Sequence, residues 1–375
     1  MYWLEDISIL LYFGLATLYF GEFDVLFQYL FVHDPTNFRE EPIKITFGIL
    51  ALLVLLFFGA GCGDMQAIQA PQKGQTGQER GVTMNKPFTQ KTSIKEVIES
   101  PVLEPYGRLL FPVHTGCMSG HTLEDLQLIW YSHIDPQETI AIVNALWERA
   151  RQKETVFYDI YSDAEKAADP RKKDTGLFFF KGRKGAPFAV VNAGGGFVYV
   201  GAMHDSFPHA YELSKRGYNA FALIYRPGAQ TACEDLARAI SFIFAHAAEL
   251  GVDTKHYSLW GGSAGARMAA YLGSYGPAAF GGNDLPRPGA VIMEYTGHSD
   301  YTKNDPPTFA VVGDDDGIAN WRVMQRRLET LSNLGIPTEF HHYPGLGHGF
   351  GLGTGTASEG WFDKAVAFWE AQMKK

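Results

Sequence analysis

The chain has 375 residues, of which 46% are hydrophobic and 19% are charged, so its composition is that of a globular protein and not of a disordered one. A formal net charge of -9 argues against a nucleic acid as the main partner, because phosphate binding needs clusters of lysine and arginine that the sequence lacks. Three cysteines, Cys62, Cys117 and Cys233, are too few for a disulfide framework.

The N-terminal part of the chain contains two apolar runs, residues 7–21 and 45–61. The first is short for a membrane span, which needs about 20 apolar residues. The second follows Lys44 and ends in small residues directly before Cys62, which is the layout of a secretory signal. It resembles a bacterial lipoprotein signal, although Gly59 stands where such signals usually carry leucine. The resemblance implies that Cys62 is lipidated and anchors the protein in the bacterial cell envelope, with the domain that follows it outside the cytoplasm.

Other interpretations of residues 1–61 stay open. A lipoprotein signal should begin near the N-terminus, so it would require translation to start near Ile43. Alternatively, the two runs form a hairpin of uncleaved membrane helices, for which Arg39 and Lys44 favour a cytoplasmic loop, or they form a buried helical hairpin. Residues 62–90 are rich in Gln, Gly and Thr and lack apolar periodicity, so we expect a flexible tether there.

Residues 91–155 show apolar side chains at three- and four-residue spacing, which predicts a helical N-terminal extension. Thr122 is the expected cap of its second helix, and Pro136 opens its third. We expect this extension to pack on the domain that follows it. The predicted helices cover residues 93–100, 122–130 and 136–152.

Residues 156–375 alternate short β-rich runs with helical segments. Continuous apolar strands that alternate with helices predict a mostly parallel central sheet with helices on both faces. In such sheets the functional residues gather at the carboxyl ends of the strands. The predicted strands lie within residues 155–162, 175–182, 187–194, 218–226, 257–263, 289–297, 308–314 and 338–344.

A Gly-x-Ser-x-Gly motif places Ser263 between Gly261 and Gly265, directly after one predicted strand and before a helix-compatible segment. This is the setting of a nucleophile elbow, a tight turn in which small residues two before and two after the serine let strand and helix approach closely. The motif predicts Ser263 as a nucleophile.

With this motif in place, the region from about residue 160 to 375 resembles the α/β-hydrolase superfamily, and its acetyl esterase, lipase and carbohydrate esterase branch in particular. The glycines of "NAGGGFVYVG" resemble the loop of that branch that stabilises a tetrahedral oxyanion through backbone N–H groups. The resemblance implies donors at Gly195, Gly196 and Ala264. Ala193 stands where the family usually has a histidine that props this loop.

Two further segments resemble those that carry the other members of a catalytic triad. "TFAVVGDDDGIA" resembles the strand and turn of the triad acid, and its pattern selects Asp316 over the two preceding aspartates and over Glu294. "YPGLGHGFGLG" resembles the loop of the catalytic histidine, which implies His348. The chain order Ser263, Asp316, His348 is the α/β-hydrolase order.

Several other side chains are candidates for the lining of a substrate pocket. Phe197 and Tyr295 lie near predicted strand ends, and "GAMHDSFPHA" contributes His204, Asp205 and His209. Of these, Phe197, His204 and Tyr295 are the predicted substrate-binding residues.

No cofactor and no metal are expected. Within the N-terminal extension, His114, Cys117 and His121 could be taken for metal ligands, but their spacing matches no standard zinc pattern, so we expect a loop.

Together these features predict a serine hydrolase that cleaves a small-molecule carboxylic ester through an acyl-enzyme. Esters of acetylated or feruloylated carbohydrate fall within the branch that the chain resembles. The alternatives are a serine peptidase of the prolyl oligopeptidase type, or a non-catalytic envelope protein that uses a hydrolase fold for binding. The sequence does not determine the ester or the oligomeric state.

Overall fold

The computed structural model describes residues 86–374, apart from residue 114 and residues 129–131. The two N-terminal apolar runs, Cys62 and most of the predicted tether therefore lie outside the described residues. The described residues belong to one compact unit, Thr83–Lys375.

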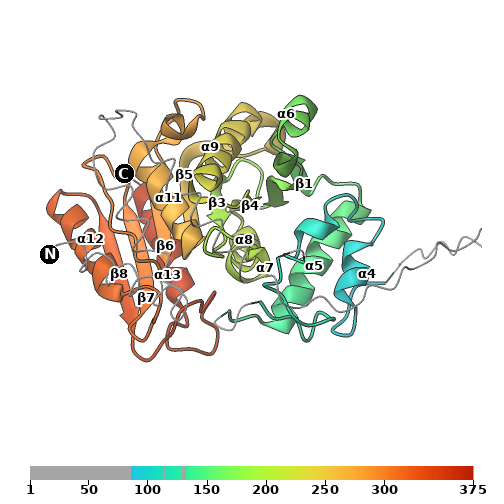
Figure 1. The fold of residues 1–375 in the computed structure, drawn as a ribbon. Helices are drawn as coiled ribbons and strands as arrows, with labels where there is room; N and C mark the ends of the chain where they lie inside the picture. The colour runs from blue at the N-terminus through green and yellow to red at the C-terminus, as the bar shows by residue number, and fades with distance from the viewer. Residues whose placement is uncertain (1–85, 114, 129–131, 375) are drawn as a thin grey trace, which may run out of the picture. The chain divides into compact units, whose positions relative to one another are not determined.

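The described part of the chain forms an eight-stranded sheet with the strand order β1-β2-β4-β3-β5-β6-β7-β8 (Figure 1). β2 runs antiparallel to both of its neighbours, and β3 to β8 are all parallel. Each predicted strand is confirmed. The strands are β1 Phe157–Asp159, β2 Gly176–Phe180, β3 Pro187–Asn192, β4 Asn219–Ile224, β5 Asp253–Gly262, β6 Ala290–Glu294, β7 Thr308–Gly313 and β8 Thr338–Tyr343.

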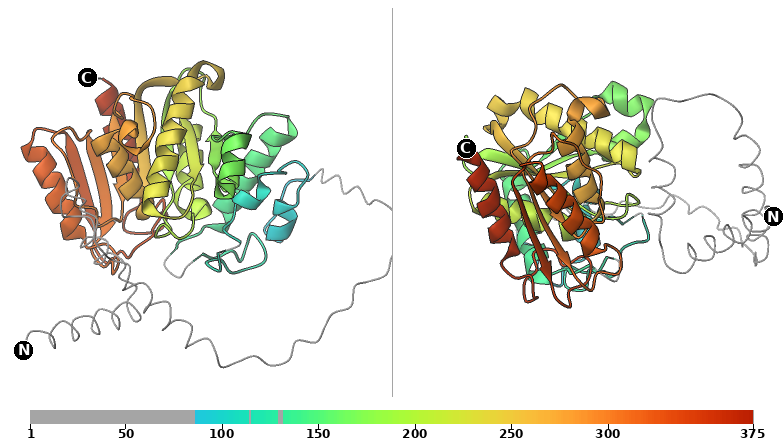
Figure 2. Two further views of the ribbon diagram at one scale, coloured as in Figure 1. Left: turned by 45° about the horizontal axis from the view of Figure 1, so that its top comes forward. Right: turned by 90° about the vertical axis from the view of Figure 1, so that its left-hand side faces the viewer.

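Two hydrophobic cores lie on opposite faces of this sheet, because alternate strand residues point to opposite sides. In β3, Ala189 and Val191 belong to the core with α8 and α13, whereas Val190 belongs to the core with α9, α11 and α12. The right-hand view of Figure 2 shows the sheet between its two helical layers. The helices are α4 Ile94–Ile98, α5 Pro136–Arg151, α6 Asp163–Ala168, α7 Ala202–Asp205, α8 Phe207–Lys215, α9 Ala229–Ala245, α10 Ala247–Leu250, α11 Ala264–Tyr275, α12 Trp321–Asn333 and α13 Trp361–Met373, with short 3-10 helices η2 Gly107–Leu109, η3 Pro170–Asp174 and η4 Pro277–Phe280.

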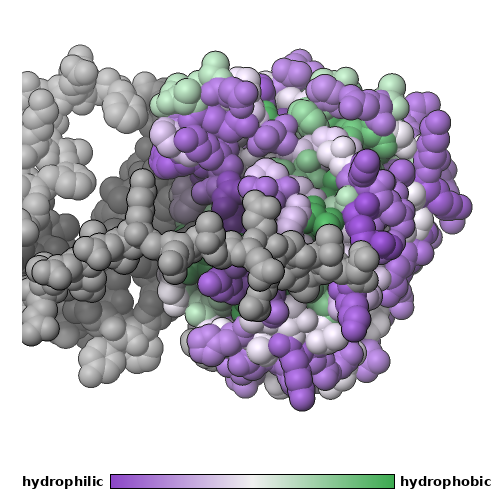
Figure 3. Space-filling model, turned by 90° about the vertical axis from the view of Figure 1, so that its right-hand side faces the viewer, coloured by the Kyte–Doolittle hydropathy of each residue, from purple (hydrophilic) through white to green (hydrophobic). Residues whose placement is uncertain are grey.

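The N-terminal extension packs on the same core as α8 and α13, as expected. α5 begins after Asp135, whose carboxylate accepts hydrogen bonds from the first-turn N–H groups of Gln137 and Glu138. The helix buries Ile142 and Trp147 against this core. Figure 3 shows the side of the molecule that carries α4 and α5, where hydrophilic residues predominate over hydrophobic ones outside the grey atoms.

The prediction of a helix over residues 122–130 is wrong for the residues that the structure describes there. Thr122 does not cap a helix but belongs to a turn, in which the Asp125 carboxylate accepts hydrogen bonds from the N–H groups of His121 and Thr122 and from the Thr122 hydroxyl. Isolated bridges join Ser93 to Thr122 and Ser119 to Gln127. The helix is absent because Gln127 N–H donates to the Ser119 carbonyl oxygen at 3.0 Å, and not to Leu123 four residues back as a helix requires.

Within the described ranges, no helix has both the length and the apolar character that crossing a membrane requires.

Candidate active site

Ser263 lies in a sharp turn between the end of β5 and the start of α11. Its backbone has φ 50° and ψ -114°, a conformation that residues other than glycine rarely adopt. A Cβ atom on Gly261 would lie 2.4 Å from the carbonyl carbon of Gly265, and one on Gly265 would lie 2.0 Å from the carbonyl oxygen of Asn192. Both glycines are therefore required by close contacts between backbone segments, and the turn presents the serine at the carboxyl edge of the sheet.

The structure brings Ser263, His348 and Asp316 together in one hydrogen-bonded chain. His348 Nδ1 lies 2.8 Å from Asp316 Oδ2, and its Nε2 lies 3.1 Å from Ser263 Oγ. Because the carboxylate accepts the proton on Nδ1, Nε2 of a neutral imidazole is left to accept the hydroxyl proton of the serine. The side chains of His348 and Asp316 are 3% and 0% exposed. The serine, the aspartate and the histidine follow β5, β7 and β8, and the sequence predicts a position after a strand for each of them.

Asp316 is fixed by its own turn after β7. Its Oδ1 accepts hydrogen bonds from the N–H groups of Ile318 and Ala319, at 2.8 and 2.7 Å, which leaves Oδ2 directed at the histidine. The neighbouring Asp314 is exposed, and its carboxylate accepts a hydrogen bond from Gly345 N.

The competing acid, Glu294, lies elsewhere. It is fully buried at the end of β6, with Oε2 at 3.1 Å from His209 Nε2. Burial raises the pKa of Glu294, although the neighbouring His209 opposes this shift. Burial by itself would lower the pKa of His209, but the Glu294 carboxylate, together with those of Asp205 and Glu138, outweighs it and the pKa is raised. Glu294 is thus held in a buried pair and does not contact His348 Nδ1, which binds Asp316.

The glycine loop after β3 lies beside the Ser263 turn, because β3 and β5 are adjacent strands. A Cβ atom on Gly194 would lie 3.0 Å from the Cβ of Ser263. Gly195 and Gly196 have φ values of 128° and 61°, which favour glycine. Among the described residues, the N–H groups of Gly195, Gly196 and Ala264 donate no hydrogen bond, so they are free to bind an anionic oxygen.

Residues 179–288 match the BD-FAE family model, which describes an esterase domain of the α/β-hydrolase type. This segment contains the glycine loop and Ser263 but ends before Asp316 and His348. The chain has the α/β-hydrolase fold.

Among solved structures, the chain is similar to an acetyl ester-xyloside bifunctional hydrolase from Caldicellulosiruptor lactoaceticus, with 21% identity, coverage of 57% of this chain and 95% of that one, and a TM-score of 0.49. It is also similar to a propionate-bound thermophilic esterase from Thermogutta terrifontis, with 21% identity, coverage of 57% and 93%, and a TM-score of 0.47. A third similar structure is MGS-M1, an α/β-hydrolase from a Medee basin deep-sea metagenome, with 22% identity, coverage of 54% and 93%, and a TM-score of 0.46. No curated protein matches the chain in sequence.

The three residues that we expected to line a substrate pocket occupy different positions in this hydrolase fold. Phe197 follows the glycine loop with a φ of 60° and is half-buried, beside the exposed Val198. His204 and Tyr295 differ from the expectation, because they are only 5% and 0% exposed. Their polar atoms are engaged by protein groups, so we assign them to the support of the site and not to its surface.

Asp205 is the functional candidate whose position could not be derived from the sequence. The sequence makes it one of three candidates for the pocket lining in "GAMHDSFPHA" and indicates no supporting role for it. In the structure its buried carboxylate contacts Gly194 N, the Tyr295 hydroxyl and the ring of His204. The only signal in the sequence was a charged residue shortly after the glycine loop.

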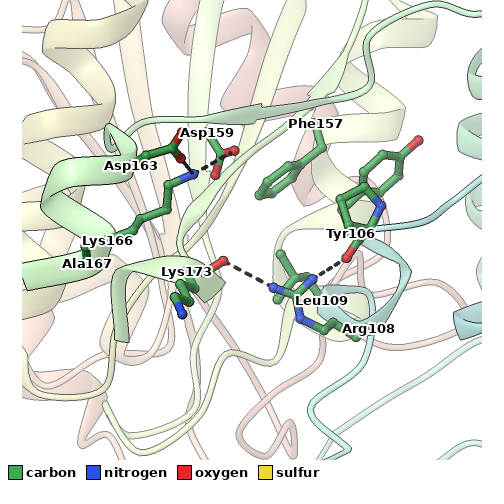
Figure 4. A pocket seen from close by; sticks show the side chains of 10 residues that line it. Tyr106, Arg108, Leu109, Phe157, Asp159, Asp163, Lys166, Ala167 and Lys173 are labelled. Atoms are coloured by element: carbon green, nitrogen blue, oxygen red, sulfur yellow. Dashed lines mark hydrogen bonds and ion pairs between the residues drawn. The ribbon is translucent and has the colours of Figure 1, made fainter. Parts of the chain in front are cut away.

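A cavity of about 450 Å³ lies at the β1 end of the sheet (Figure 4). The Lys166 ammonium group, which pairs with Asp159 and Asp163, lies on one side of it, and Tyr106 and Leu109 lie on the other. Asp159 is aligned through β2 with the carboxyl end of β4, so the cavity is on the same edge of the sheet as Ser263. Four strand positions separate β1 from β5, which corresponds to roughly 19 Å. The cavity is therefore separate from the hydrogen-bonded triad.

The described residues contain no group of three or more His, Cys, Asp and Glu side chains that could hold a metal ion. Of the three residues considered in the N-terminal extension, His114 lies outside the described residues. The Cys117 thiol is directed at the Thr115 carbonyl oxygen, at 3.6 Å.

Proposed function

We propose that the protein is a serine hydrolase that cleaves carboxylic esters through an acyl-enzyme. The observation that carries this proposal is the hydrogen-bonded chain from Ser263 Oγ through His348 to Asp316, at the carboxyl edge of a mostly parallel sheet. The match of residues 179–288 to an esterase-type family model supports a hydrolase, and it favours esters over peptides as substrates.

In the proposed reaction His348 Nε2 takes the proton of Ser263 Oγ as the oxygen attacks the ester carbonyl carbon. The Asp316 carboxylate holds the proton on Nδ1 and stabilises the imidazolium ion that forms. The imidazolium then gives its proton to the departing alcohol, and an acyl-serine remains. In the second half of the reaction, His348 Nε2 takes a proton from water as the water oxygen attacks the acyl carbon. The imidazolium then returns the proton to Ser263 Oγ, and the carboxylic acid is released.

The negative charge that develops on the carbonyl oxygen needs preorganised donors. The N–H groups of Gly195, Gly196 and Ala264 are the proposed donors. Ala264 N is at the start of α11, where the positive end of the helix dipole adds to the stabilisation.

The proposed substrates are small acyl esters or acetylated or feruloylated carbohydrate. We further propose that the protein is anchored at a bacterial membrane, through lipidated Cys62 or through the N-terminal apolar runs, with the catalytic domain outside the cytoplasm. These N-terminal residues lie outside the part of the chain that the structure describes.

The test is hydrolysis by the full-length protein of a panel of acyl esters and prolyl peptides, with Ser263→Ala as the matched variant. We expect turnover of one or more esters by the wild type, no turnover of prolyl peptides, and no turnover by Ser263→Ala. Cleavage of peptides in preference to esters would show that the protein is a serine peptidase and not an esterase. Ester turnover that survives in Ser263→Ala would exclude this serine as the nucleophile.

A further inference from the structure

We propose that Asp205 is a positioning residue that holds the glycine loop and the His348 loop in register with Ser263. This inference rests on the proposed function, because positioning has meaning only for a site in which Ser263 and His348 react. It assigns a role to a buried carboxylate that the triad does not use.

The first contact joins Asp205 to the glycine loop. Asp205 is the last residue of α7 and is 2% exposed, and its Oδ2 accepts a hydrogen bond of 2.8 Å from Gly194 N. A Cβ atom on Gly194 would lie 2.4 Å from that oxygen, and one on Gly262 would lie between 2.7 and 2.9 Å from the carboxylate atoms. The absence of side chains at these two positions lets the carboxylate approach both the glycine loop and the Ser263 turn.

The second contact leads to the catalytic histidine. The Tyr295 hydroxyl donates to Asp205 Oδ1, and the tyrosine ring packs edge-on against His348 with 5.0 Å between ring centroids. Burial, together with the Asp205 charge, raises the pKa of Tyr295 well above its ordinary value. The hydroxyl therefore keeps its proton and remains a donor to the carboxylate, which fixes the ring that supports His348.

The third contact leads to the residue that follows His348. His204 Nδ1 lies 3.3 Å from Asp205 Oδ1, and His204 Nε2 donates to the Gly349 carbonyl oxygen at 2.9 Å. The Asp205 carboxylate therefore contacts the glycine loop directly and the His348 loop through Tyr295, and it lies beside His204, which binds the next residue of that loop. The two loops follow different strands, β3 and β8, and their position relative to Ser263 decides whether a tetrahedral intermediate fits.

The identity of residue 193 explains why the loop needs this support. Ala193 is fully buried and has no polar side chain, although the resemblance to the esterase branch places a loop-propping histidine there. The hydrogen bond from Gly194 N to the Asp205 carboxylate instead anchors the residue that follows Ala193. A reacting group displaced by about 1 Å can lose on the order of a hundredfold in rate, so an anchor of this kind affects the rate far more than it affects substrate binding.

The test compares Asp205→Ala, Asp205→Asn and Tyr295→Phe with the wild type. The measurements are kcat and KM for an ester and the rate constant for phosphonylation of Ser263 by a fluorophosphonate. We expect Asp205→Ala to lower kcat and the phosphonylation rate by a similar factor, on the order of ten to a hundredfold, with little change in KM. Asp205→Asn keeps one acceptor oxygen and should restore part of the rate. Tyr295→Phe keeps the ring and should cost less than Asp205→Ala.

The matched control is Asp305→Asn, since Asp305 is also buried and paired, with Arg327, but contacts none of the site residues. It should lower Tm without lowering kcat per folded molecule. Unchanged kcat and phosphonylation rates in all three variants would overturn the proposal, as would rate losses no larger than the loss of folded protein. If wild-type Ser263 is not phosphonylated, the proposed function fails and this inference fails with it. If it is phosphonylated and the variants react equally fast, only this inference fails.

Discussion

The Ser263 backbone has a conformation that residues other than glycine rarely adopt. A non-glycine residue in such a conformation costs roughly 1 to 3 kcal/mol, which the surrounding structure must offset. Close approach of β5, α11 and β3 through Gly261 and Gly265 supplies that packing. The strain points the hydroxyl out of the turn toward His348, so the geometry needed for nucleophilic attack exists before a substrate binds.

At the same scale, we predict that Asp316→Asn lowers kcat by roughly three to four orders of magnitude, because an amide in place of the carboxylate holds the histidine in the wrong tautomer. Asp314→Asn is the matched control, since it keeps an acceptor for Gly345 N and does not touch His348. Asp315→Asn should also cost little. Steady-state kinetics of the three variants check this prediction. If Glu294→Gln loses most of its activity while Asp316→Asn stays active, Glu294 at the end of β6 is the triad acid.

A second prediction concerns the glycine loop. Gly195→Val should lower kcat by on the order of a hundredfold or more, because the φ of 128° suits glycine and a Cβ atom would lie 2.1 Å from the Tyr199 carbonyl oxygen. Displacement of the loop would remove donors from the oxyanion. The measurement is the kcat of Gly195→Val, with its Tm compared with that of the wild type to show that the variant is folded. A kcat equal to that of the wild type would place the oxyanion hole elsewhere.

At the scale of elements, the features that the sequence predicts correctly are those that depend on residues close together in the chain. The apolar strand runs and the Gly-x-Ser-x-Gly turn are local patterns, and the structure has each of those strands and that turn in place. The prediction for residues 122–130 is wrong because Gln127 N–H, which a helix would bond to Leu123 four residues back, donates to the Ser119 carbonyl oxygen instead. The role of Asp205 depends on contacts with residues 11 and 90 positions away, which no local pattern encodes.

The first turn of α5 gives a prediction on pH dependence. Burial raises the pKa of Glu138 to about 7, and the nearby carboxylates of Glu212 and Asp135 add to the shift while His209 and Lys215 oppose it. A carboxyl group whose pKa is higher in the folded state binds its proton more tightly there, so its ionisation costs stability as pH rises from about 4.5 to 7.

We therefore predict that Glu138→Gln raises Tm by roughly a few degrees at pH 8 and changes it little at pH 4. The control on the same helix is Glu148→Gln, because Glu148 is exposed and its hydrogen bonds with Arg151 and Gln152 lower its pKa. That variant should not gain stability at pH 8. Thermal unfolding at both pH values decides, and equal Tm changes for Glu138→Gln at pH 4 and pH 8 would contradict the assignment.

At the scale of the whole molecule, the strand order assembles the site. β3 and β5 are neighbours, so the glycine loop and the Ser263 turn emerge side by side. β7 and β8 are neighbours as well, which places the Asp316 turn beside the loop that carries His348. Only β6 separates the two pairs. Residues 85 positions apart, Ser263 and His348, thereby meet at one edge of the sheet.

The proposed membrane anchor is tested on the whole protein in a bacterial host. We predict that Cys62 is acylated and that Cys62→Ser either releases the protein from the membrane fraction or leaves an unprocessed precursor. Mass spectrometry of the native N-terminus is the measurement. An intact peptide that spans residues 50–70 in the mature protein would contradict processing at this cysteine.

The most direct test of the central claim is the site at which a fluorophosphonate becomes bound to the full-length wild-type protein. The account predicts one phosphonyl group per chain, located on Ser263 by peptide mass spectrometry. Labelling should be lost in Ser263→Ala, strongly slowed in Asp316→Asn, and unchanged in Asp314→Asn. An enzyme that hydrolyses esters while Ser263 stays unmodified, or that carries the phosphonyl group on another residue, would contradict the account.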